Sequence, residues 1–216
     1  MSKLFVHFFF IILSSLIIQG CYPEPKVIEI DFPTTSENKK IKIALIPFSG
    51  IDAIYPKLLK TEIEVFYNCK VTIVPEQKLP DFAYYKPRNR YKADSLLKYL
   101  KQSLPLEHEL ILGITNKDVS TKDEIHDDWG VFGLGFLGGP SCVVSDFRLK
   151  KSAKNKRHLQ ERLVKVVLHE LGHTLGLPHC TANKKCLMRD AEGTIKSVDE
   201  EEKYLCESCK KKLQHK

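Results

Sequence analysis

Residues 169–180 read HELGHTLGLPHC, and this stretch contains three of the chain's 8 histidines. His169, Glu170, His173, Gly176 and His179 stand in the order H-E-x-x-H-x-x-G-x-x-H. Two histidines one helical turn apart can bind one metal ion, and a third ligand must approach from another direction. Gly176 permits the chain to turn and bring His179 back toward the metal, because glycine adopts backbone conformations that are costly for other residues. The pattern predicts a zinc ion held by three histidines, with one coordination position open.

The residues before the motif predict a helix that carries it. Leucine or valine recurs every four residues over 163–175 and forms a core stripe, whereas His169 and His173 fall about 140° away from that stripe. We therefore expect the histidines to face a cleft.

Glu170 is the candidate catalytic residue. It directly follows a ligand, so it is placed to take the proton of a zinc-bound water, whose pKa falls from about 15.7 toward about 7. The same carboxyl can then return the proton to the leaving amine, while the metal polarises the scissile carbonyl. The alternative is a zinc that only holds the fold together, but such a site has no use for Glu170 and favours closed sets of four ligands.

Four further cysteines lie within 30 residues of one another, namely Cys180, Cys186, Cys206 and Cys209. Four thiolates suit a structural zinc ion, and two disulfides are the competing interpretation for an exported chain. Cys69 and Cys142 could form a bridge or stay as buried thiols. Each lies in or beside a predicted strand, which slightly favours the thiols.

The N-terminal 20 residues have the features of an export signal. Lys3 is the only charge, and the apolar run from Leu4 to Ile18 is shorter than the roughly 20 residues of a membrane-spanning helix. Gln19-Gly20-Cys21 resembles the end of a bacterial lipobox, in which Cys21 is lipidated and becomes the new N-terminus. A plain secretory signal or an uncleaved anchor is the alternative. We expect an exported bacterial lipoprotein, membrane-anchored in the cell envelope (periplasm or cell surface), with residues 21–40 as an extended tether.

The remaining residues, 41–216, predict one α/β domain. Strand-length runs alternate with helical patterns, which indicates βαβ units and a mostly parallel sheet. The runs in chain order are Ile41–Pro47, Pro56–Asn68, Val71–Val74, Tyr91–Gln102 and Glu109–Thr115. Val131–Phe147, around Gly138-Gly139-Pro140, predicts a hairpin, whereas residues 116–130 show no clear element.

Composition excludes several classes of protein. With 43% hydrophobic and 28% charged residues, the chain is neither disordered nor collagen-like. Its formal charge of +7 is a mild excess that points to no particular partner. The basic stretch Arg148–Lys165 lacks interleaved aromatic residues, so we expect a solvated loop and helix start there and no nucleic acid as partner. We expect a monomer.

The motifs together resemble the archaemetzincins (archaelysins), zinc metallopeptidases of the metzincin clan. In that family HExxHxxGxxHC is followed by C-x-M and then by CxxC. Here Cys186-Leu187-Met188 precedes Cys206-Glu207-Ser208-Cys209 by the family's 17 residues. The five residues between Cys180 and Cys186 are one more than the family usually has. Segments that begin at Arg88 and Ser141 also resemble the family.

This resemblance implies a compact metzincin-like α/β domain with a mixed, mostly parallel sheet and a cleft below an antiparallel edge strand. It also implies that Met188 forms an apolar floor beneath the imidazoles and that the four cysteines bind a second zinc ion. Val131–Leu137 is the candidate edge strand, to which a peptide could add by main-chain hydrogen bonds. Its glycines either allow close backbone approach or merely make the hairpin flexible.

The leading hypothesis is a lipid-anchored zinc metallopeptidase that acts on peptides or unfolded protein segments. The alternative is a lipoprotein binding module that keeps the metzincin zinc cleft without turnover. The intact Glu170 argues against that alternative.

Overall fold

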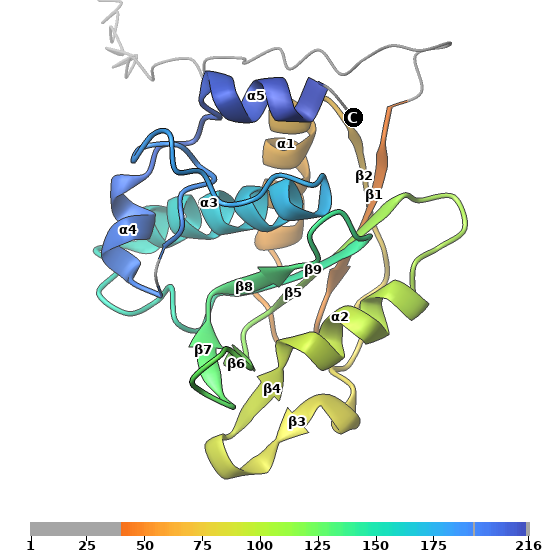
Figure 1. Ribbon diagram of the computed structural model, residues 1–216. Coiled ribbons are helices and arrows are strands. Elements are labelled where there is room, and N and C mark those ends of the chain that lie inside the picture. The colour runs from red at the N-terminus through yellow and green to blue at the C-terminus, as the bar shows by residue number, and fades with distance from the viewer. Residues whose placement is uncertain (1–39, 192, 215–216) are drawn as a thin grey trace, which may run out of the picture.

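A five-stranded sheet forms the centre of the computed structural model, which describes residues 40–191 and 193–214 (Figure 1). The strand order is β2-β1-β5-β9-β8. Four strands run parallel, namely β1 (Lys42–Pro47), β2 (Lys70–Ile73), β5 (Leu110–Thr115) and β9 (Ser141–Ser145). The edge strand β8 (Gly133–Gly135) pairs antiparallel with β9. This confirms the predicted mixed, mostly parallel sheet with an antiparallel edge strand.

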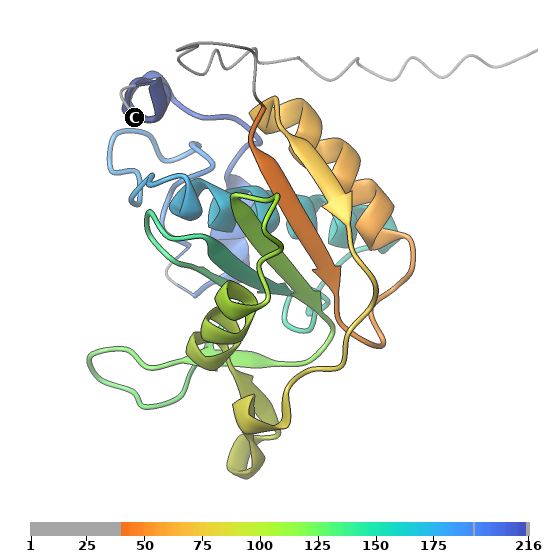
Figure 2. The same ribbon diagram turned by 90° about the vertical axis from the view of Figure 1, so that its right-hand side faces the viewer.

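Helices cover both faces of this sheet (Figure 2). Alternate residues of β1 point to opposite faces. Leu45 packs in one core with α1 (Tyr55–Tyr67) and α3 (Lys156–Thr174). Ala44 and Ile46 pack in the other core with α2 (Ala93–Gln102). Because both faces are covered, the central strands are continuous apolar runs rather than alternating ones.

A second, four-stranded sheet in the order β3-β4-β6-β7 lies beside the main one. It consists of β3 (Tyr84–Tyr85), β4 (Arg90–Lys92), β6 (Val119–Thr121) and β7 (Trp129–Val131), with 3-10 turns η1 (Asp81–Ala83) and η2 (Lys86–Arg88). The sequence pattern does not predict this sheet. Tyr91, predicted to start a helix, pairs instead with Val119, and the helix begins at Ala93.

The candidate edge strand Val131–Leu137 needs correction. Only Gly133–Gly135 join the main sheet as β8, whereas Val131 ends β7 of the second sheet. Two strands this short, separated by Phe132 alone, give a single apolar run in the sequence. The pattern therefore shows that strand structure is present but not that the chain changes sheets within it.

The C-terminal helices α4 (Ile195–Glu200) and α5 (Glu207–Gln214) complete the fold. Arg162 of α3 is 2% exposed, and its Nε and Nη2 atoms each donate to the Asp199 carboxylate of α4 at 2.7 Å. Its Nη1 donates to the carbonyls of Leu149 and Lys151. Arg162 is thus a buried exception within the stretch that the sequence predicts to be solvated.

The predicted export signal, Cys21 and nearly all of the predicted tether fall on residues 1–39, outside the described residues. Within residues 40–191 and 193–214, no helix combines the length and apolar character that a membrane span requires.

The Arg162–Asp199 pair predicts a stability effect. Asp199→Ala leaves the buried guanidinium without its carboxylate and should lower the free energy of unfolding by about 2–3 kcal/mol. Glu200→Ala is the matched control, because Glu200 forms surface ion pairs with Arg189 and Lys196 and should change stability by less than about 1 kcal/mol. Urea unfolding measures both, and equal effects of the two variants would contradict the assignment.

Candidate active site

Helix α3 presents the first half of the histidine motif and ends just beyond it. The Asn155 side chain caps its N-terminus by accepting from the backbone N–H of His158 at 2.9 Å. Gly176 follows the last turn with φ +84°, a conformation that favours glycine, and the Leu177 N–H donates back to the Gly172 carbonyl at 2.9 Å. The chain therefore turns sharply after α3 and brings His179 back toward the helix.

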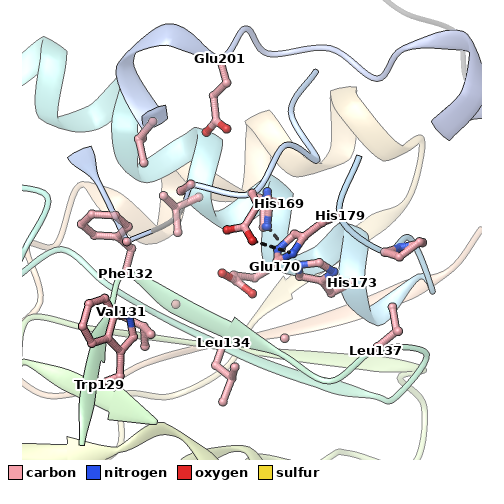
Figure 3. A pocket seen from close by; sticks show the side chains of 18 of the residues that line it. Trp129, Val131, Phe132, Leu134, Leu137, His169, Glu170, His173, His179 and Glu201 are labelled. Carbon is pink, nitrogen blue, oxygen red and sulfur yellow. Dashed lines mark hydrogen bonds and ion pairs between the residues drawn. The ribbon is translucent and has the colours of Figure 1, made fainter. Parts of the chain in front are cut away.

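The rings of His169, His173 and His179 converge on one point (Figure 3). One ring nitrogen from each lies within 4.8 Å of those of the other two. His169 Nδ1 lies 2.7 Å from the Leu187 carbonyl, and His173 Nδ1 lies 2.7 Å from the Leu177 carbonyl. His179 Nδ1 lies 3.4 Å from the Asp190 carboxylate. Such partners on the far nitrogen are typical of histidines that bind a metal through the other one.

The protonation of these rings tests whether they fit a metal ion. Carbonyl oxygens only accept, so the Nδ1 atoms of His169 and His173 must carry the protons. Burial is the main cause that lowers the pKa of His169, and the charge of the neighbouring His173 is the second cause. The pKa falls to about 3, so the ring is neutral. The two Nε2 atoms then direct lone pairs at each other across 3.0 Å. This is repulsive without a shared cation, whereas ligands of one tetrahedral zinc ion lie about 3.3 Å apart, so the residues fit zinc.

Glu170 lies between α3 and the edge strand. Its carboxyl is buried and accepts from the backbone N–H of Gly135 in β8. Burial, together with the negative charge of Glu201, raises the pKa of Glu170 to about 8. A Cβ atom on Gly135 would lie 2.5 Å from the Glu170 carbonyl oxygen. Of the two interpretations of the hairpin glycines, close backbone approach therefore holds at Gly135.

A cleft of about 750 Å³ contains the three histidines and Glu170. Apolar side chains of β7, β8, α3 and α4 form part of its wall, including Val131, Leu134, Val166 and Val198. The described lining residues also include four acids, Asp123, Glu170, Asp190 and Glu201, but no lysine or arginine. The cleft is therefore apolar in part, and its titratable lining residues other than the histidines are all acids.

Met188 joins the cleft to the cysteines that follow it. Its side chain is fully buried, and a Cβ on Gly172 of α3 would overlap its sulfur. The Met188 carbonyl accepts from the Cys180 N–H at 2.7 Å, and the preceding carbonyl, that of Leu187, is the partner of His169. The short segment Leu187-Met188 thus contacts the helix, one histidine and the cysteine cluster at once.

The sulfurs of Cys180, Cys186, Cys206 and Cys209 lie within 4.8 Å of one another. The Cys180–Cys206 and Cys186–Cys209 separations are 3.5 and 3.8 Å, far from the roughly 2.05 Å of a disulfide and close to the about 3.8 Å between ligands of a tetrahedral zinc ion. Burial opposes ionisation of Cys180, but N–H groups of Asn183 and Ala182 donate to it and bring its pKa down to about 7. The extra residue before Cys186 leaves the cluster intact.

Two acids near the site go beyond the sequence prediction, whereas the two remaining described cysteines agree with it. Cys69 and Cys142 are buried thiols without a disulfide, as the sequence slightly favours. Asp190, the partner of His179, and Glu201, in the cleft wall, are not predicted. Glu201 stands in an acidic run, DEEE at 199–202, where the sequence offers no signal that one member is buried.

Comparison with known proteins gives matches to the described domain. The family model for Peptidase family M54 matches residues 41–215, a range that includes the three histidines and the four cysteines. An archaemetzincin of Halobacterium salinarum is 30% identical over 178 residues, covering 79% of this chain and 98% of the relative. An archaemetzincin of Methanocaldococcus jannaschii is 34% identical over 179 residues, covering 81% and 93%.

Solved structures give the same result. The crystal structure of archaemetzincin from Methanopyrus kandleri matches with a TM-score of 0.70 and 28% identity, covering 84% of this chain and 98% of that one. The structure from Archaeoglobus fulgidus, complexed with malonate, matches with a TM-score of 0.67 and 30% identity, covering 80% and 99%.

Proposed function

This chain belongs to peptidase family M54, the archaemetzincins, and is a zinc metallopeptidase; from that premise we propose that it cleaves peptides or unfolded protein segments with Glu170 as general base and then general acid. The observation that carries the proposal is the convergence of three imidazoles beside a buried carboxyl in one cleft. A site that only stabilised the fold would need neither the cleft nor the carboxyl.

His169, His173 and His179 would hold the catalytic zinc ion through the nitrogens that face one another. When bound, such an ion polarises the scissile carbonyl and lowers the pKa of a water ligand toward about 7. The Leu177 and Leu187 carbonyls and the Asp190 carboxylate fix the orientation of the rings. The chain thus sets the direction of all three ligands before the ion arrives.

Glu170 would move the proton. The Gly135 N–H holds its carboxyl on the cleft side of α3, where the carboxylate can accept the proton of the attacking water. The protonated carboxyl then faces the amine that leaves when the peptide bond breaks, and returns the proton to its nitrogen. One group serves both steps because both take place in the same cleft.

The edge strand β8 would align the substrate. β8 is the last strand of the main sheet, and its residues Gly133, Leu134 and Gly135 line the cleft opposite α3. An extended peptide that paired with the outer edge of β8 would lie between this strand and the histidines. Main-chain pairing of this kind favours unfolded segments, since a folded substrate has no extended strand to offer.

The four cysteines would hold a second, structural zinc ion. Their sulfur separations support this over two disulfides. An ion there would tie Cys206 and Cys209, at the start of α5, to the segment that holds His169.

We also propose that the protein is exported and anchored in the membrane of a cell envelope by a lipid on Cys21. The support comes from the sequence, where a basic residue, an apolar run and Gly20 precede this cysteine.

Glu170→Gln should separate catalysis from binding. The substitution keeps size and most hydrogen bonding but removes the proton acceptor, so kcat for peptide cleavage should fall by about 10² to 10⁴ while zinc content stays unchanged. Glu161→Gln, on the exposed side of the same helix, is the matched control and should keep full activity. If the wild type binds zinc but shows no turnover above Glu170→Gln on any peptide of a diverse mixture, it is a binding module and not an active peptidase.

Metal analysis should find two zinc ions per wild-type chain. His173→Ala should retain one, because two remaining imidazoles hold an ion poorly while the cysteine cluster stays complete. Atomic emission on protein purified with a reductant gives the count. A wild-type value of one that falls to none in His173→Ala would remove the cysteine site from the proposal.

Mass spectrometry of the native protein tests the anchor. The mature N-terminus should be Cys21 carrying a diacyl or triacyl modification, and Cys21→Ala should move the protein from the membrane fraction to the soluble one. An unmodified N-terminus at or after this position would mean ordinary secretion.

A further inference from the structure

Glu201 is a buried acid that the proposed reaction does not use. It is 3% exposed and lines the cleft, and its Oε2 atom has no hydrogen-bond partner among the described residues. Figure 3 shows its side chain pointing from the end of α4 toward the cleft. A buried carboxyl oxygen without a partner is costly, so its presence in a binding cleft requires an explanation.

The cations nearest to Glu201 are engaged elsewhere. The Lys165 ammonium donates to the backbone carbonyls of Val198 and Glu201 at 2.8 and 2.7 Å. The Arg189 guanidinium pairs with Glu200 at 3.3 Å. Both charges favour the ionised form of Glu201, but burial outweighs them and raises its pKa to about 8. Among the described residues, Lys165 and Arg189 thus act on the Glu201 carboxyl only through their charge, and none donates a hydrogen bond to Oε2.

The apolar residues that line the same cleft as Glu201 indicate what could supply that donor. Val166, Val198 and Phe132 line the same cleft and give it an apolar surface. A lysine or arginine side chain combines an apolar stem with a cationic head, so the stem suits these walls and the head suits the carboxylate. The described cleft lining also contains no lysine or arginine that would repel a basic peptide.

We propose that Glu201 determines specificity by receiving a lysine or arginine side chain of the substrate near the scissile bond. This inference rests on the proposed peptidase function and adds the substrate class to it. The cation would supply the missing donor to Oε2, and its charge would favour the ionised form of Glu201, which burial opposes.

Matched peptides test this assignment. Quenched fluorescent peptides carry a single lysine, or norleucine as its uncharged counterpart, at each position from three before to three after the cleaved bond. The wild type should favour lysine at one position by about 10- to 100-fold in kcat/KM, the effect of a buried charged hydrogen bond. In Glu201→Gln this ratio should fall to within about threefold of one.

Glu202→Gln is the control variant. Glu202 is the next residue and carries the same charge, but it is exposed and pairs with Lys185 on the surface. Its lysine preference should equal that of the wild type. Absence of a preference at every position, or a preference that persists in Glu201→Gln, would overturn the assignment.

A binding measurement separates this inference from the proposed function. Fluorescence anisotropy on zinc-loaded Glu170→Gln protein compares the Kd of the lysine and norleucine peptides without turnover. About tenfold tighter binding of the lysine peptide, lost in Glu170→Gln/Glu201→Gln, supports the role of Glu201 even if the wild type cleaves nothing. Equal Kd values would overturn it even if the wild type is an active peptidase.

Discussion

The contact between Leu187-Met188 and helix α3 is the constraint on which the site depends. An imidazole on a helix can rotate, and His169 is held in one orientation because the Leu187 carbonyl occupies the far side of its ring. That carbonyl can reach the ring only because Gly172 lets Met188 lie against the helix. Leu187 and Met188, which take no part in the proposed chemistry, thus fix the orientation of the His169 ring.

This segment is in turn held by the C-terminal part of the chain. The Leu187 N–H donates to the Tyr204 carbonyl, and the Cys180 N–H donates to Met188, so both sides of the segment are bonded. The cysteine cluster gathers the residues before and after it, and Arg162–Asp199 fastens α4 to α3. The residues between Met188 and Cys206 therefore position the cleft wall, which includes Val198 and Glu201.

The sequence predicts those parts of the molecule whose geometry is local. The histidine spacing, the turn at Gly176 and the alternation of strands and helices all depend on residues close together in the chain, and the structure has all three. The sequence pattern misses the second sheet because Tyr91 pairs with Val119, which lies far along the chain and is not indicated by any local pattern. Arg162 and Glu201 are missed for the same reason, because burial of a charged residue depends on distant partners.

The cleft contains two buried acids, Glu170 and Glu201, which differ in their hydrogen-bond partners and in their proposed roles. Glu170 is buried beside three imidazoles, and a backbone N–H donates to its carboxyl, so its charge has a partner within the protein. In the proposed reaction this carboxyl also accepts and returns a proton. No described residue donates to Oε2 of Glu201, and the negative charge of Glu201 makes ionisation of Glu170 less favourable. A chain under pressure for stability alone would replace Glu201 with an uncharged residue of similar size, since that removes the desolvation cost. Its presence in the wall of the cleft is therefore better explained by a cation that arrives with the substrate than by any contact within the fold.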